Sequence, residues 1–251
     1  MREGKREQLT PYNDQLIFVK PTSHCAVNMK FALKPSFYAL FAGAMFVCAS
    51  AGAQTQVVGN AKVGESKAAL CVGCHGILNF KTAFPEVHKV PRIHGQSGPY
   101  IVAALTAYQK GERKHPSMVD VAEALTPQDK ADLAAYFSGQ GLPALKSDEP
   151  SKKPSAEVAA LIEKGGCTAC HGTNFSKPVD PSYPKIGGQH ADFLYFALKA
   201  YTVEGHSLVG RSNPVMAGIA KQFKPAELKQ LANYLSSIQG EVRTVRQDTF
   251  R

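Results

Sequence analysis

The chain has 251 residues, which is enough for one or two domains of ordinary size, and its formal net charge is +9. Residues 54–251 contain 23 Lys and Arg against 17 Asp and Glu, and no basic cluster is interleaved with aromatic side chains. This composition argues against a nucleic-acid-binding protein. A mildly basic balance is typical of a solvated surface that steers an acidic partner.

The segment 29–53 has the three parts of a secretory signal peptide. Lys30 and Lys34 precede an apolar run over residues 37–48, and small residues follow it up to Ala53. The apolar run is short for a membrane span of about 20 residues, so we expect cleavage near Ala53, with an uncleaved anchor as the alternative. Residues 1–28 do not fit a signal. We expect them to be a non-native upstream extension before a true start at residue 29, with a longer signal n-region as the alternative.

Two copies of a C-x-x-C-H sequence contain all four cysteines that remain after such a cleavage. Residues three and four apart are neighbours on a helical turn, so each copy presents two thiols and one imidazole to a single flat ligand. This is the pattern of covalent haem attachment, in which the histidine lies beneath the iron. The predicted attachment points are Cys71 and Cys74 with His75, and Cys167 and Cys170 with His171.

Zinc binding and thiol redox chemistry are the alternatives for these cysteines. Two C-x-x-C pairs can bind one zinc ion, but 92 residues separate Cys74 from Cys167, far more than is usual for paired zinc knuckles. A redox couple does not require a histidine directly after its second cysteine. No thiol is left over for a disulfide, which agrees with haem attachment in an oxidising compartment.

Apolar periodicity and capping residues predict helices around the first motif. One helix runs into the motif and includes Gly64, the next ends at Gly111, and the last begins at Thr126 with Pro127 in its first turn. We expect the segments between them to be loops. The first predicted helix covers residues 61–70, the second begins at 97 or 99 and ends at 111, and the third begins at 127 and ends at 139 or 141. The predicted loops cover residues 77–90 and 112–119.

The same order of features is repeated in the second half of the chain. Residues 142–154 are rich in Pro, Lys and Ser and predict a linker. After it, residues 184–189 match the Pro-x-Ile-x-Gly-Gln pattern of residues 91–96, and two further helices follow, the last over 225–239. The sequence therefore predicts an all-α protein with one domain over 54–141 and a second over 155–251, each wrapped around a haem.

Residues 54–251 contain only two methionines, Met118 and Met216. They follow His75 and His171 by 43 and 45 residues, and each comes shortly after a proline in a predicted loop. A single Met is usually a core filler. The matching positions instead favour a second axial ligand for each iron.

Histidines are the competing candidates for that second position. His88 and His94 have no counterparts in the second repeat, and His115 and His206 precede the methionines at unequal distances. We expect His190, at a helix start, to face solvent or cap the helix. Ligation by two histidines remains the alternative, and His94 could face a haem edge or solvent.

A filled sixth position leaves no open site at iron for a substrate. A thioether ligand favours ferrous iron and raises the reduction potential relative to two imidazoles. Both properties predict an outer-sphere electron carrier rather than an enzyme.

The order of haem motif, Pro-x-Ile-x-Gly-Gln segment, helix, methionine and terminal helix resembles class I cytochrome c, and its tandem form resembles cytochrome c4. The resemblance covers residues 61–239. It implies two covalent haem c groups, a periplasmic location, and proline carbonyls, those of Pro91 and Pro184, that accept a hydrogen bond from the proximal histidines. Arg92 and Lys185 could pair with haem propionates or be solvated surface residues.

The expected function is transport of single electrons between respiratory complexes, for example from a quinol-oxidising complex to a terminal oxidase. The expected partners are such membrane complexes, with peripheral membrane association left open and nucleic acid excluded. A cytochrome subunit of a flavocytochrome-type dehydrogenase is the alternative. A dihaem peroxidase ranks third, because it needs a displaceable sixth ligand.

Overall fold

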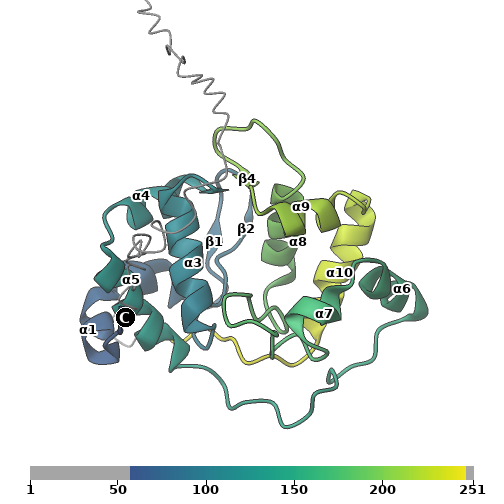
Figure 1. Cartoon of the computed structure of the whole chain (residues 1–251), viewed down its shortest axis with the longest axis horizontal. Helices are drawn as coiled ribbons and strands as arrows, with labels where there is room; N and C mark the ends of the chain where they lie inside the picture. Colours follow the sequence, from purple (N-terminus) through teal and green to yellow (C-terminus); the bar gives the residue numbers. More distant parts are fainter. Residues whose placement is uncertain (1–56, 247–251) are drawn as a thin grey trace, which may run out of the picture. The chain divides into compact units, whose positions relative to one another are not determined.

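The computed structural model describes residues 57–246. The predicted extension (1–28) and signal peptide (29–53) lie outside this range. Within it, no helix combines the length and the apolar character needed to cross a membrane. Short helices dominate, and Figure 1 shows those of the first half in blue and teal beside those of the second half in green and yellow. The helices are α1 (Ala61–Lys67), α2 (Ala69–His75), α3 (Gly98–Gln109), α4 (Pro116–Glu123), α5 (Pro127–Ser138), α6 (Ala156–Lys164), α7 (Cys167–His171), α8 (Ala191–Ala200), α9 (Pro214–Ala220) and α10 (Pro225–Ser237).

The caps of these helices are local hydrogen bonds that the sequence specifies. Thr126 and Asp129 form a reciprocal capping box at the start of α5, with Pro127 in the first turn. The Ser155 hydroxyl accepts a hydrogen bond from the Val158 amide at the start of α6. The helix start predicted at Thr126 is confirmed.

Three local predictions are wrong. The helix predicted over 61–70 is broken at Ala68, which separates α1 from α2. The loop predicted over 77–90 contains a small antiparallel hairpin of β1 (Lys81–Thr82) and β2 (His88–Lys89). The loop predicted over 112–119 contains β3 (Arg113–Lys114) and the start of α4. These elements are too short for hydrophobic periodicity to reveal them.

The prediction that both methionines lie in loops is also wrong. Met118 lies in the first turn of α4 and Met216 in the first turn of α9, so both are helical rather than in loops. A proline opens each helix, where its missing amide hydrogen costs nothing. The Asn213 side chain caps α9 by accepting from the Met216 amide. A proline is a helix-start signal as well as a loop residue, and here Pro116 and Pro214 each begin a helix.

Each half has its own apolar core. In the first, α1 crosses α5 closely, since an added Cβ on Gly64 would lie 2.0 Å from the Asp132 carbonyl oxygen. In the second, α10 packs on α8 and α6. The buried residues of the first core are Ala68, Val72, Ile101, Leu133, Ala134, Tyr136 and Phe137; those of the second include Phe175, Leu194, Ala232, Tyr234, Leu235 and Ile238.

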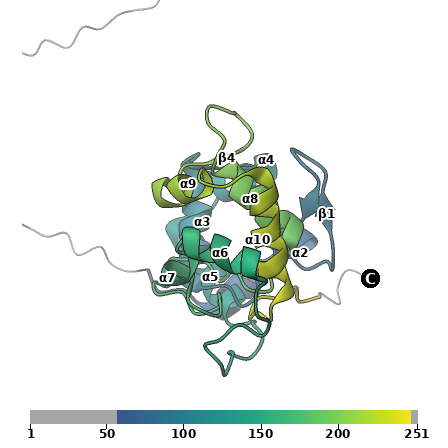
Figure 2. The ribbon, with the colours of Figure 1, turned by 90° about the vertical axis from the view of Figure 1, so that its right-hand side faces the viewer.

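Backbone contacts between the halves include a strand pair and the segment that follows α10. Strand β3 pairs antiparallel with β4 (Gly210–Arg211), which places Arg113 opposite Arg211. The segment after α10 returns to the first half, where the Arg243 amide donates to the His94 carbonyl at 2.9 Å. Figure 2 views the molecule from the side of the second half, with α6, α7, α8, α9 and α10 nearest the viewer.

Candidate haem sites

Both C-x-x-C-H motifs lie on helices, as the spacing predicts. Helix α2 contains the first motif and α7 the second. All four cysteines of the described range have free thiols, and burial raises the pKa of Cys71 and of Cys167. Each helix therefore presents two unpaired sulfur atoms and the histidine that follows them.

The two histidines are held by equivalent hydrogen bonds. His75 Nδ1 donates to the Pro91 carbonyl oxygen at 2.8 Å, and His171 Nδ1 donates to the Pro184 carbonyl oxygen at 3.1 Å. Both side chains are buried, and burial lowers the pKa of each imidazole. A neutral ring that donates through Nδ1 leaves the Nε2 lone pair available for a metal.

One large cavity joins the two motifs. Its volume is about 1210 Å³, above the range of about 300–1,000 Å³ that is usual for a single small-molecule pocket. Its apolar wall includes Ile101 and Leu133 from the first half and Leu194 and Leu231 from the second. All the predicted attachment points and axial ligands line it, namely Cys71, Cys74, His75, Met118, Cys167, Cys170, His171 and Met216.

The competing histidines differ in their surroundings. His94 is fully buried, its Nδ1 accepts from the Val245 amide at 3.5 Å, and its ring meets Phe137 edge-on. His88 lies flat on Phe196 with 4.1 Å between ring centroids. His88 and His115 line the cavity, whereas His94 does not.

The prediction for His190 is wrong. The sequence predicts that its side chain faces solvent or caps α8, but the side chain is buried and makes no cap hydrogen bond. Arg92 and Lys89 of the first half lie near it, and a single helix start carries no signal of such distant neighbours. Burial, together with the nearby positive charges of Arg92 and Lys89, lowers the pKa of His190 to about 4.

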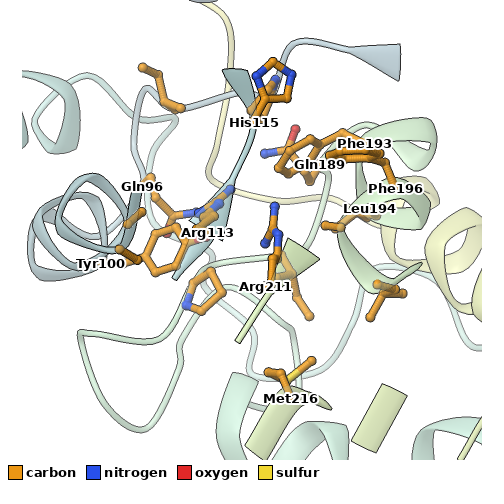
Figure 3. A pocket seen from close by; sticks show the side chains of 18 of the residues that line it. Gln96, Tyr100, Arg113, His115, Gln189, Phe193, Leu194, Phe196, Arg211 and Met216 are labelled. Atoms are coloured by element: carbon orange, nitrogen blue, oxygen red, sulfur yellow. The ribbon is translucent and has the colours of Figure 1, made fainter. Parts of the chain in front are cut away.

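Two arginines that the sequence analysis missed point into the cavity (Figure 3). Arg113 donates to the Tyr100 hydroxyl at 3.1 Å and lies over the Tyr108 ring, while Arg211 lies over the Tyr201 ring. Neither arginine forms an ion pair with any acidic residue of the described range.

The buried Arg113 Nε has no hydrogen-bond partner. Burial opposes the charge of this guanidinium, but the surrounding tyrosine hydroxyls raise its pKa, so it stays protonated. A signal was present in the sequence, because each arginine lies five residues before a methionine, at 113 and 118 and at 211 and 216.

These groups fit haem better than they fit a bare metal ion or a redox thiol pair. Within residues 57–246, no three His, Cys, Asp or Glu side chains gather into a metal site. An apolar cavity with paired thiols, a histidine that offers Nε2, a thioether and unpaired cations suits an iron porphyrin, whose edge carries two carboxylates. Fold and site together define a c-type cytochrome with two covalently bound haem c groups.

Comparison with known proteins agrees with this class. The cytochrome c family model matches residues 155–239. Cytochrome c4 of Azotobacter vinelandii is 27% identical over 197 residues, which cover 72% of this chain and 90% of that protein. Cytochrome c-552 of Acidithiobacillus ferridurans is 31% identical over 179 residues, with 67% and 73% covered. The crystal structure of reduced recombinant cytochrome c4 from Pseudomonas stutzeri is 25% identical, covers 72% of this chain and 100% of that chain, and superposes with a TM-score of 0.52.

The chain belongs to the cytochrome c family, as a cytochrome c4-like protein of two tandem class I domains. It is a dihaem electron carrier that acts with redox partner proteins, not an enzyme. The predictions of an all-α tandem cytochrome fold and of two haem c cofactors are confirmed.

Proposed function

We propose that each repeat forms a closed, six-coordinate haem site. The histidine after each cysteine pair is the proximal ligand, and the methionine in the first turn of α4 or α9 is the distal ligand. The observation that carries this assignment is that all these side chains line one cavity, at equivalent positions in the two repeats. The proposed sets are Cys71, Cys74, His75 and Met118 for the first haem, and Cys167, Cys170, His171 and Met216 for the second.

When bound, each haem supplies an iron that exchanges one electron between its ferrous and ferric states. The chain's own residues orient the group and exclude water. Pro91 and Pro184 fix the two imidazole rings through their carbonyl oxygens. Arg113 and Arg211, which line the cavity, offer positive charge to the propionates. With both axial positions filled, electron transfer is outer-sphere.

We further propose that the protein works in the periplasm, where it accepts electrons from a quinol-oxidising complex and delivers them to a terminal oxidase. Two c-type haems suit an exported carrier, because thioether attachment keeps the cofactor on a chain that has left the cytoplasm. The export signal expected over 29–53 and the mildly basic balance, which favours an acidic partner, support this role.

A redox titration of the purified holoprotein with optical detection, combined with intact mass, tests the ligand assignment. The expected result is two haems, both with methionine-ligated spectra. In Met118→Ala one potential should fall by more than about 0.1 V, since axial ligands set haem potentials over about 0.8 V. The same variant should bind carbon monoxide at one haem, and Met216→Ala should affect the other haem. Val179→Ala, which truncates an exposed side chain that does not line the cavity, is the control and should change neither.

Reconstitution with isolated membranes tests the proposed partners. The reduced protein should be oxidised by membranes that contain a terminal oxidase, and the oxidised protein should be reduced by quinol in the presence of a quinol-oxidising complex. Stable copurification of a flavoprotein would favour the dehydrogenase-subunit alternative instead. Turnover of peroxide by the wild-type protein would contradict the closed sites.

A further inference from the structure

The glutamine that ends each Pro-x-Ile-x-Gly-Gln segment has no role in the site described so far. Gln96 and Gln189 are both buried, and neither side chain bonds within its own haem motif. A buried amide needs partners for its oxygen and its nitrogen. Both glutamines find these partners in the opposite repeat.

Gln96 holds a single residue of the second repeat from both sides. Its Oε1 accepts from the Lys185 amide at 2.8 Å, and its Nε2 donates to the Lys185 carbonyl oxygen at 2.9 Å. The same Oε1 also accepts from the Ser97 amide at 2.9 Å. The orientation of the amide is unambiguous, because two N–H groups meet its oxygen and a carbonyl meets its nitrogen.

Gln189 makes the reciprocal contacts with the first repeat. Its Oε1 accepts from the Arg92 amide at 2.9 Å, and its Nε2 donates to the Arg92 carbonyl oxygen at 2.9 Å. Its Oε1 also accepts from the His190 amide at 3.0 Å. Each repeat therefore contributes one side-chain amide that hydrogen-bonds to the backbone N–H and C=O groups of one residue in the other repeat, and the two sets of bonds match. Figure 3 shows Gln96 and Gln189 on opposite sides of the pocket.

The clamped residues directly follow the prolines that hold the proximal histidines. The Lys185 amide belongs to the same peptide group as the Pro184 carbonyl, which accepts from His171 Nδ1. A hydrogen-bonded chain therefore runs from His171 through one peptide group to the Gln96 side chain of the other repeat. An equivalent chain runs from His75 through the Pro91–Arg92 peptide to Gln189.

We propose that Gln96 and Gln189 are positioning residues that act across the repeat boundary, each setting the hydrogen bond of the proximal histidine that serves the other haem. The reduction potential of each haem thus depends on a side chain of the opposite repeat. This inference rests on the proposed assignment of His75 and His171 as proximal ligands.

The direction of the effect follows from polarisation along the chain of hydrogen bonds. An acceptor on a peptide N–H increases the electron density on the carbonyl oxygen of that peptide. A stronger carbonyl acceptor gives the imidazole more anionic character and makes it a better donor to iron, which stabilises the ferric state. Gln96 therefore lowers the potential of the second haem, and Gln189 that of the first.

Potentials of individual haems in the Gln96→Met and Gln189→Met holoproteins test the proposal. An oxidative titration followed by NMR separates the two haems, whose signals are assigned through contacts with Cys71 or Cys167. In Gln96→Met we expect the potential of the second haem to rise and that of the first to stay unchanged. Gln189→Met should give the opposite pattern, so each variant is the matched control for the other.

A second readout follows the hydrogen bond itself. In the reduced protein, the Nδ1 proton of His171 should shift upfield in Gln96→Met, and that of His75 should keep its position. If Gln96→Met does not fold, Gln96→Leu serves in its place. Leucine also removes the acceptor from the Lys185 amide, so it should likewise raise the potential of the second haem.

Some outcomes would overturn the proposal. A shift confined to the haem of the mutated residue's own repeat, equal shifts of both haems, or no shift would each show that the glutamines only hold the interface together. Haem content and the methionine-ligated spectrum of the same variants report separately on the proposed ligands. A wrong ligand assignment would appear there and in the Met118 and Met216 variants.

Discussion

Individual residues define the chemistry of this protein, and burial decides how each one behaves. The cysteine pairs, the histidines that follow them and the two methionines are proposed as haem ligands from residue type and spacing alone, because a ligand acts through its own atoms. The folded surroundings instead decide the behaviour of three other residues, Arg113, Arg211 and His190. Arg113 stays charged in the interior because tyrosines face it, whereas His190 stays neutral because it is buried and arginine and lysine lie nearby.

The depressed pKa of His190 predicts a pH dependence of stability. Its folded-state pKa is about 4, below the unfolded value of about 6.5. Protonation therefore favours the unfolded chain. The stabilising contribution is complete above pH 6.5 and is lost as the pH falls towards 4. Between pH 7 and pH 4.5, the unfolding free energy of the wild-type protein should fall by about 1–2 kcal/mol more than that of His190→Asn.

Denaturant unfolding of the holoprotein at several pH values measures this slope. His206→Asn is the matched control, because His206 is exposed and asparagine can replace its acceptor role in the turn that follows. An unchanged slope in His190→Asn would mean that this imidazole is accessible to protons in the folded protein.

Helices were predictable where a cap and a proline coincide, as at Thr126 and Pro127, because the stabilising bonds lie within four residues. The short elements were not predictable. Strand β3 has two residues, and only its pairing with β4, about 100 residues further along the chain, makes it a strand. Glycine is intrinsically unfavourable within a helix, yet the close packing of α1 against α5 requires Gly64.

The approach of α1 to α5 predicts a large effect for Gly64→Ala. The added methyl group would lie 2.0 Å from the Asp132 carbonyl oxygen, which is backbone and has little freedom to move. Separating the helices should cost about 1–3 kcal/mol, although alanine favours the helix intrinsically. A lower thermal midpoint of the holoprotein is the expected measurement.

Gly218→Ala is the matched control for that variant. Gly218 also lies in a helix, but an added Cβ would meet no atom within 4 Å. It should leave the midpoint unchanged or raise it slightly, by helix propensity alone. If both variants behaved alike, the close crossing of α1 and α5 would not explain Gly64.

At the scale of the whole described chain, the two repeats share one interface and one cavity. The glutamine clamps, the β3–β4 pair and the returning segment after α10 all cross between them. Val242 of that segment is 2% exposed, and the Glu241 carbonyl accepts from the Leu142 amide. We therefore expect the repeats to unfold together rather than one at a time.

Val242→Ala tests this coupling. Removing two methyl groups from this almost fully buried side chain should destabilise the protein by about 1–2 kcal/mol. Both haem environments, followed by their separate spectral signals, should melt at the same lower temperature. Val58→Ala, at a position that is 83% exposed, should have no effect. Two separate transitions, with only one shifted, would contradict a shared interface.

The amino-acid sequence by itself determined the haem motifs, the tandem repeat, the paired methionines and the helix caps. Each of these depends on residue type and on spacing over a few residues, or on direct repetition, which can be read along the chain. Only the tertiary structure decided which side chains of one repeat meet the other. Gln96 and Lys185 are 89 residues apart, and no local pattern records the pairing. Their contact exists because burying the shared interface offsets the entropy of ordering both repeats. That packing joins two local haem sites into one molecule.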